Sequence, residues 1–173
     1  MNLKSIIREV QDFPKVGINF KDVTTLLQDG AAYRHAIDEC AKLIEDLEYD
    51  VIVGPEARGF LIGAPLAYAK TKPFVLVRKP GKLPSETITF EYELEYGTDS
   101  LQIHKDAILP GQKVLITDDL LATGGTVAAI VKMVESLGGE VVGLLFLMEL
   151  DFLEGRSKIG DYRFESLIHY GAE

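Results

Sequence analysis

Apolar residues recur along this chain with two periods, one typical of helices and one typical of strands. Between Ala31 and Leu47 they return every three or four positions, as on the buried face of an amphipathic helix. A second helix is expected from Gly59 to Ala69, where most residues are small or apolar. A third is expected where an apolar helical face from Val127 to Leu137 is ended by Gly138 and Gly139.

Short apolar runs between these helices predict strands. The expected strands are Val51–Val53, Phe74–Val77, Lys113–Thr117 and Val141–Met148. Strands that alternate with helices imply a parallel sheet covered on both faces, with right-handed crossovers. Ligands of such sheets bind beyond the carboxyl ends of the strands, so we expect the functional site there.

Three segments lie outside this alternation. Met1–Val10 is predicted to be a helix, which Pro14 and Gly17 then break. From Thr87 to Tyr96 apolar and polar side chains alternate, with the period of a half-buried strand. The tail, Asp161–Glu173, carries several aromatic and aliphatic residues and fits either a final strand or a subunit contact.

Composition narrows the class of protein. A chain of 173 residues, of which 47% are hydrophobic and 26% charged, suits one packed domain. The excess of acids over bases, 27 against 18, disfavours nucleic acid and anionic membranes as partners. The single cysteine, Cys40, allows no intramolecular disulfide and is expected in the core, and the chain start leads into no membrane-length apolar run. We therefore expect a cytoplasmic protein.

The most informative segment is Val114–Thr126, an apolar strand that ends in two acids and continues in a small-residue loop before a helix. Glycines let the backbone approach an anion, and the free amides and dipole of the helix start favour a phosphate. Thr123 and Thr126 add hydroxyl donors. Asp118 and Asp119 would repel a phosphate, so they fit ribose hydroxyls, or Mg²⁺ held directly or through water. A P-loop does not fit, because no lysine follows the glycines at its spacing.

Two basic features accompany this loop. Arg78, Lys79 and Lys82 form a cluster in an otherwise acidic chain, which indicates either a local anion site or a solvated surface. Arg58 follows the strand Val51–Val53, which Gly54 and Pro55 end, and it is either an anion ligand or a solvated arginine in a strand-to-helix turn.

The run Val114–Thr126 resembles the phosphoribosyl pyrophosphate signature of type I phosphoribosyltransferases. Gly54–Phe60, Arg78–Pro84, Tyr92–Gly97 and Phe13–Asp22 are similar to segments of the adenine phosphoribosyltransferases, in family order over nearly the whole chain. This resemblance implies an α/β fold in one domain, residues 1–173. It consists of a mainly parallel central sheet flanked by helices, an N-terminal hood over about 1–30 and a mobile lid hairpin over about 78–104.

The resemblance also implies an activity, the conversion of adenine and phosphoribosyl pyrophosphate into AMP and pyrophosphate for purine salvage, with Mg²⁺ and in a homodimer. By this resemblance, the 5′-phosphate is held by Ala122, Thr123, Gly124, Gly125 and Thr126. Asp118 and Asp119 bind the ribose. The diphosphate is bound by Ala57, Arg58, Arg78, Lys79 and Lys82.

Glu95 stands where the family motif Leu-Glu-Tyr-Gly places a catalytic acid, so the resemblance gives it proton handling at the purine. Glu91 and Glu93, on the same side of the alternating strand, are expected to face solvent. Adenine recognition falls to the hood residues Ile18, Asn19, Phe20 and Lys21. Phe20 either stacks on the purine or is a core aromatic. Many family members carry Arg in place of Lys21 and an apolar residue in place of Asn19, which leaves base specificity open.

Two other functions compete with this interpretation. A regulator could keep the ligand loop as a metabolite sensor while it binds nucleic acid, but such a protein should carry a basic surface. An enzyme of the same fold could act on hypoxanthine, guanine, xanthine or orotate and differ in hood and lid. His35, His104 and His169 have no partner at metal-ligand spacing and are expected to be structural or surface residues.

Overall fold

A five-stranded parallel sheet forms the centre of the computed structural model, which describes residues 1–93 and 96–172. The strands lie in the order β4, β3, β7, β8, β9, and each neighbouring pair is parallel. Their bounds are β3 Val51–Pro55, β4 Phe74–Val77, β7 Lys113–Leu121, β8 Glu140–Leu150 and β9 Phe164–Tyr170. All four strands predicted above are present, and the tail supplies the fifth as a strand.

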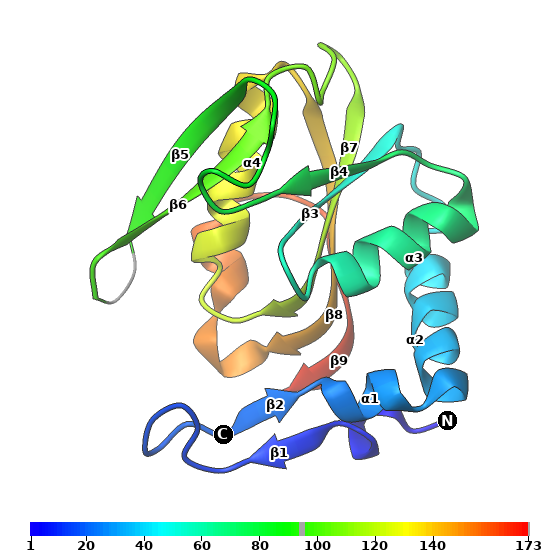
Figure 1. Cartoon of the computed structure of the whole chain (residues 1–173). Helices are drawn as coiled ribbons and strands as arrows, with labels where there is room; N and C mark the ends of the chain where they lie inside the picture. The colour runs from blue at the N-terminus through cyan, green and yellow to red at the C-terminus, as the bar shows by residue number, and fades with distance from the viewer. Residues whose placement is uncertain (94–95, 173) are drawn as a thin grey trace.

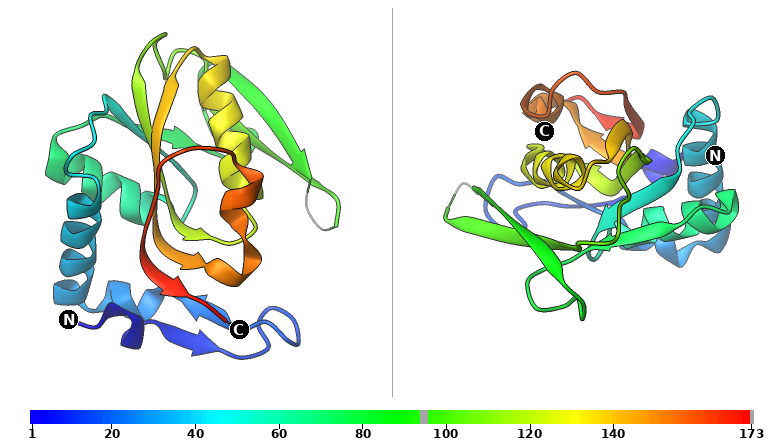
Figure 2. Two further views of the ribbon diagram at one scale, coloured as in Figure 1. Left: turned by 180° about the vertical axis from the view of Figure 1, so that it is seen from behind. Right: turned by 90° about the horizontal axis from the view of Figure 1, so that it is seen from above.

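Helices cover both faces of this sheet, as the chain pattern predicts (Figures 1 and 2). α2 (Gly30–Leu43) and α3 (Phe60–Lys70) pack on one face, and α4 (Gly125–Ser136) packs on the other. α2 begins at Gly30 because the Asp29 carboxylate accepts hydrogen bonds from two amides of its first turn, each at 3.0 Å. In the part of the chain that the structure describes, no helix is long and apolar enough to cross a membrane.

The prediction of a helix over Met1–Val10 is wrong. This segment forms a short 3₁₀ helix, Leu3–Ser5, and then β1 (Arg8–Val10), which pairs antiparallel with β2 (Phe20–Asp22) before α1 (Thr24–Gln28). Tertiary contacts override local helix propensity here, because β1 finds a partner strand across the loop that Pro14 and Gly17 create. Figure 1 shows these hood elements beside the carboxyl ends of β8 and β9.

The expected lid is a β-hairpin beside α4 (Figure 1). β5 (Thr87–Glu93) pairs antiparallel with β6 (Thr98–His104), which places Tyr92 directly opposite Asp99. As the alternation predicts, the side chains of Ile88, Phe90 and Tyr92 are half-buried, whereas Glu91 and Glu93 are exposed. A backbone bridge between Arg78 and Gln102 joins the hairpin to the end of β4.

Candidate active site

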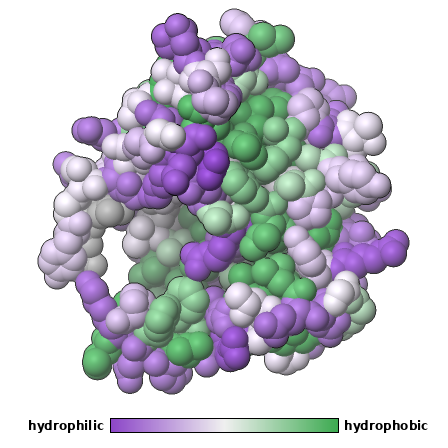
Figure 3. Space-filling view, in the orientation of Figure 1, coloured by the Kyte–Doolittle hydropathy of each residue, from purple (hydrophilic) through white to green (hydrophobic). Residues whose placement is uncertain are grey.

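The site lies at the carboxyl ends of the neighbouring strands β3 and β7. β3 leads into the loop that carries Ala57 and Arg58, and β7 leads into the loop of residues 122–124 that precedes α4. Because β3 and β7 are parallel neighbours, the loops that follow them lie side by side at one edge of the sheet, although they are about 60 residues apart in sequence. Figure 3 shows the surface hollowed between the lid hairpin and the hood.

The glycine-containing loop after β7 forms the first cavity, of about 200 Å³. Its lining consists of Arg58, Asp118, Asp119, Leu120, Leu121, Ala122, Thr123, Gly124, Gly125, Thr126 and Val127. Gly124 precedes α4 with a φ of +86°, a conformation that L side chains rarely adopt. The cavity therefore meets the amino end of a helix, whose free amides and dipole favour an anion.

Two adjacent acids and one arginine form the charged centre of this cavity. The Nε of Arg58 lies 2.9 Å from Oδ2 of Asp119, a carboxylate that is almost fully buried. The backbone amide of Asp119 donates a hydrogen bond to Oδ1 of Asp118 at 2.8 Å. Burial and the neighbouring charge of Asp119 raise the pKa of Asp118 well above its ordinary value. A ligand that brings cations or hydroxyl donors would relieve this repulsion.

A second cavity, of about 360 Å³, adjoins the first and shares its charged centre. Ala57 and Lys79 line it together with Arg58, Asp118, Asp119 and Thr126, and the lid contributes Tyr92. Lys79 forms an ion pair with Asp99, which lowers the pKa of the Asp99 carboxyl, and the Tyr92 hydroxyl donates to the same carboxylate at 3.3 Å. The two cavities thus bring together Arg58, Lys79, Asp118 and Asp119, which the sequence predicts for the site.

Sequence reasoning missed Tyr92 and Asp99 as site residues. The available signal was the hairpin itself, because residues directly opposite each other on antiparallel strands point to the same face. Tyr92 was expected on the inward face of the hairpin. Asp99 lies directly opposite Tyr92, so its side chain is on the same inward face.

Two predicted residues lie outside the cavities, and a third is not among the described residues. Arg78 donates to the Glu56 carboxylate at 3.1 Å, and that carboxylate also accepts from the Lys79 amide at 2.8 Å, so Arg78 supports the loop from behind. Lys82 is exposed and stands outside the lining of both cavities. Glu95, the expected catalytic acid, lies outside the described residues.

The predicted adenine-binding residues of the hood divide into two groups. Phe20 packs edge-to-face on Phe13 and borders an apolar cavity of about 290 Å³, and its ring lies 5.6 Å from the guanidinium carbon of Arg58. Ile18 is exposed. The Asn19 amide donates to Glu9 at 2.7 Å, and the buried Lys21 ammonium lies 3.2 Å from the same carboxylate. The side chains of Asn19 and Lys21 are therefore engaged inside the hood.

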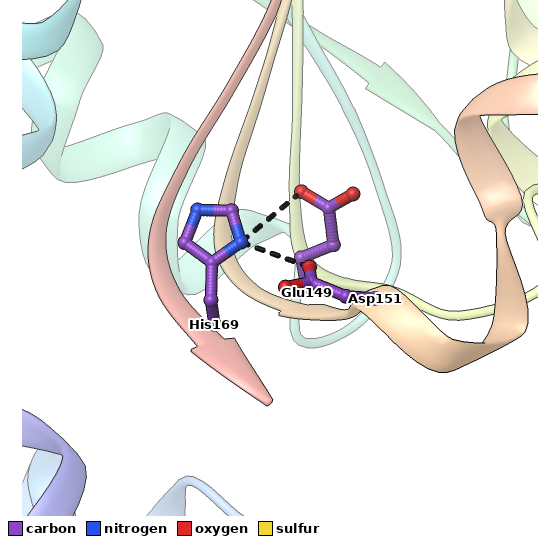
Figure 4. Close-up of side chains that lie close together, drawn as sticks. All are labelled: Glu149, Asp151 and His169. Carbon is purple, nitrogen blue, oxygen red and sulfur yellow. Dashed lines mark hydrogen bonds and ion pairs between the residues drawn. The ribbon is translucent and has the colours of Figure 1, made fainter. Parts of the chain in front are cut away.

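A potential metal cluster, Glu149, Asp151 and His169, lies at the ends of β8 and β9 (Figure 4). Its geometry is that of an ion-pair network. Both Glu149 oxygens accept hydrogen bonds from Arg156, at 2.7 and 2.6 Å. The Ser166 hydroxyl also donates to Oε2 of Glu149 at 2.6 Å, so the one buried carboxylate of the cluster is already paired with a cation and hydrogen-bonded. We therefore assign no metal to this cluster.

Comparison with known proteins matches residues 22–171 to the phosphoribosyl transferase domain family. The adenine phosphoribosyltransferase of Alkaliphilus oremlandii is 61% identical over 170 residues, which cover 98% of this chain and 99% of that protein. The chain belongs to the adenine phosphoribosyltransferase family. The crystal structure of the Thermoanaerobacter pseudethanolicus adenine phosphoribosyltransferase superposes with a TM-score of 0.95 at 60% identity, covering 97% of this chain and 98% of that one.

A more distant adenine phosphoribosyltransferase, from Saccharomyces cerevisiae, was crystallised with adenine and an imino-altritol bisphosphate. It is 41% identical, has a TM-score of 0.89, and the match covers 95% of this chain and 96% of that one. Membership of the family confirms the type I phosphoribosyltransferase fold. It also establishes the class of activity, a pentosyl transfer in which adenine and phosphoribosyl pyrophosphate give AMP and pyrophosphate.

Proposed function

We propose that this transfer takes place in the two adjoining cavities at the ends of β3 and β7. The charged groups along the cavities match, in order, the groups along the substrate. The single observation that carries the proposal is the shared lining of the cavities by Arg58, Asp118 and Asp119. A helix start lies on one side of these residues, and a loop with Lys79 lies on the other. The 5′-phosphate, ribose and diphosphate of one ligand match this sequence of surfaces.

The 5′-phosphate binds in the loop Ala122–Thr126. The amides at the start of α4 have no partner inside the helix, and the Thr123 and Thr126 hydroxyls can donate to phosphate oxygens. The open conformation at Gly124 lets the backbone approach the ligand closely. Asp118 and Asp119, at the end of β7, accept hydrogen bonds from the ribose hydroxyls.

The diphosphate binds in the second cavity, at Ala57, Arg58 and Lys79. Without ligand, Arg58 is paired with Asp119 and Lys79 with Asp99, so both cations already lie in the site. When the diphosphate binds, its oxygens replace these carboxylates as partners of the two cations. Arg78 and Lys82 act from outside the cavities. As the diphosphate leaves C1 of the ribose it gains negative charge, which these fixed cations stabilise.

Mg²⁺ is the cofactor that fits this site. The donors available in the cavity are carboxylate oxygens, which Mg²⁺ prefers, and Asp118 and Asp119 place two such groups side by side in both cavities. Asp118 and Asp119 would hold the ion through the diphosphate or through water. When bound, Mg²⁺ neutralises charge on the diphosphate leaving group.

Adenine enters between the hood and the charged centre. Phe20 supplies the stacking surface, and Ile18, Asn19 and Lys21 contribute through their backbone, since the side chains of Asn19 and Lys21 are bound to Glu9. The Saccharomyces cerevisiae enzyme was crystallised with adenine, which supports adenine as the base of this family. Glu95 handles the proton of the attacking ring nitrogen.

We also propose that the protein is a cytoplasmic homodimer of one domain, residues 1–173, with its hood over about 1–30 and its lid over about 78–104. Apolar side chains gather on the face formed by α3 and β4 (Figure 3), where Leu76 and the ring of Tyr68 are exposed. Such a patch suits a subunit contact. Sedimentation of the wild type and of Tyr68→Glu tests this proposal. The wild type should sediment as a dimer and the variant as a monomer. The buried, unpaired Cys40 suits a reducing compartment.

Pyrophosphate release by the purified protein with phosphoribosyl pyrophosphate, Mg²⁺ and adenine tests the residue assignments. Asp119→Asn and Glu95→Ala should each lower kcat by at least tenfold. Glu93→Ala, an exposed neighbour on β5, is the matched control and should keep the wild-type rate. Binding of phosphoribosyl pyrophosphate without turnover with any base would instead indicate a metabolite sensor.

A further inference from the structure

The ion pair between Glu149 and Arg156 lies directly behind the proposed phosphate loop. Glu149 stands near the end of β8, where it is the register partner of Leu121 on β7. Its buried carboxylate receives both guanidinium hydrogen bonds of Arg156, and the Ser166 hydroxyl adds a third at 2.6 Å. A bidentate arginine fixes orientation as well as distance.

Arg156 belongs to the short 3₁₀ helix η3 (Gly155–Lys158), which packs against the phosphate loop without spare room. A Cβ added at Gly155 would lie 2.4 Å from the carbonyl oxygen of Ala122, and one added at Gly124 would lie 2.6 Å from the carbonyl oxygen of Gly155. Both distances are far below van der Waals contact. The backbones of η3 and the phosphate loop therefore touch, and any shift of one displaces the other.

We propose that Arg156, held by Glu149, is a positioning residue for the 5′-phosphate site. The pair pins η3 to the end of β8, and η3 in turn holds Ala122 and Gly124 in the conformation that receives the phosphate. This inference rests on the proposed function, because it requires that residues 122–126 bind the 5′-phosphate. Arg156 itself lies outside the lining of both cavities and need not contact the substrate.

The assignment predicts a selective effect on ligands. AMP carries its phosphate in the loop that η3 supports, whereas pyrophosphate binds at Ala57, Arg58 and Lys79 on the other side of Asp118 and Asp119. Loss of the pair should loosen only the first site, because preorganised donors lose affinity when their support is removed. A general loss of structure would weaken both ligands.

The experiment is calorimetric titration of the wild type, Arg156→Ala and Arg156→Lys with AMP and, separately, with Mg²⁺ and pyrophosphate. Arg156→Ala should raise the Kd of AMP at least tenfold and change that of pyrophosphate less than twofold. Arg156→Lys keeps the charge but not the fork, so it should fold even if Arg156→Ala does not, and should weaken AMP to an intermediate degree. Arg163→Ala is the matched control, because it breaks a bidentate pair with Asp46 at the amino end of β9, away from the site.

Equal weakening of both ligands, or unchanged AMP binding by the folded variants, would overturn the inference while the wild type still binds AMP. Failure of the wild type to bind AMP would instead overturn the proposed function, and the inference with it.

Discussion

The guanidinium of Arg58 lies between Asp119, at 2.9 Å, and the ring of Phe20, at 5.6 Å. One side chain therefore connects the end of β7 to the hood, across the space proposed for the reacting ribose and base. Arg58 lies in the turn that precedes α3, and its partners Asp119 and Phe20 are far away in sequence. Arg58 therefore links the proposed phosphate-binding residues to the proposed adenine-binding residues.

Replacement of Arg58 by lysine should damage catalysis more than folding. Lysine keeps the charge but cannot bond a carboxylate or diphosphate in the fixed geometry of the guanidinium. A lost hydrogen bond to a charged group costs about 1.5–3 kcal/mol, so kcat/KM for phosphoribosyl pyrophosphate should fall about 10- to 100-fold. Steady-state kinetics measures this. Arg34→Lys, an exposed arginine on α2, should leave kcat/KM unchanged, and an equal loss there would refute the role of Arg58.

Asp118→Asn should make the unliganded protein more stable and less active. The substitution removes a charge next to Asp119 but keeps the oxygen that accepts the Asp119 amide. A gain of about 1 kcal/mol would raise Tm by about 2–4 °C in a chain of this size. Thermal denaturation at pH 7 measures the gain, and activity at the same pH should fall at least tenfold.

The pH dependence of that gain has a definite sign. The folded-state pKa of Asp118 is raised, so the folded wild type binds its proton more tightly than the unfolded chain does. Ionisation above the folded pKa costs stability, and this cost disappears as the pH falls toward the unfolded value of about 4. The Tm difference between Asp118→Asn and the wild type should therefore shrink from pH 7 to pH 4. A difference that grows on acidification would contradict the raised pKa.

Gly124→Ala should weaken phosphate binding by more than backbone strain alone explains. Gly124 and Gly111 have nearly the same positive φ, +86° and +84°, but a Cβ at Gly124 meets the Gly155 carbonyl at 2.6 Å while one at Gly111 meets open space. In both alanine variants the left-handed backbone conformation destabilises the folded state by about 1–2 kcal/mol. Only Gly124→Ala should raise the KM for phosphoribosyl pyrophosphate, by tenfold or more. Similar KM values for both variants would show that the contact with η3 does not matter.

Asp99→Asn should strengthen pyrophosphate binding. In the unliganded structure the Asp99 carboxylate competes with the diphosphate for Lys79. Partly exposed ion pairs contribute about 0–1 kcal/mol, so the Kd of pyrophosphate should fall by up to about fivefold. Titration with Mg²⁺ and pyrophosphate measures it, with Glu86→Gln, which breaks the exposed pair with Lys105, as the control. Weaker binding by Asp99→Asn would mean that the carboxylate helps to hold the ligand.

The central sheet and the phosphate loop were predictable because their signals are local. Apolar runs, such as the one that leads into Asp118, mark buried parallel strands, and the glycines after it mark a close backbone approach. The N-terminal strand was not predictable in the same way. Arg8, Glu9 and Val10 become a strand only because Phe20–Asp22 lies beside them, and no local pattern shows that pairing.

Much of the site geometry is likewise non-local. The sequence placed Arg58 and Asp119 in neighbouring loops, but the ion pair between them depends on how two β–loop–α units stack. Lys21 and Asn19 were assigned to adenine from their place in the hood, and only the fold shows both side chains bound to Glu9. The support of the phosphate loop by Arg156 depends on an end-of-strand contact that no spacing reveals.

The most direct test of the central claim is a competition among bases. The protein is supplied with Mg²⁺, a limiting amount of phosphoribosyl pyrophosphate, and equal concentrations of adenine, hypoxanthine, guanine and xanthine, and the nucleotide products are separated and quantified. We expect AMP as the product, with pyrophosphate in equal amount. A different nucleotide as the main product would contradict the assignment of the hood to adenine.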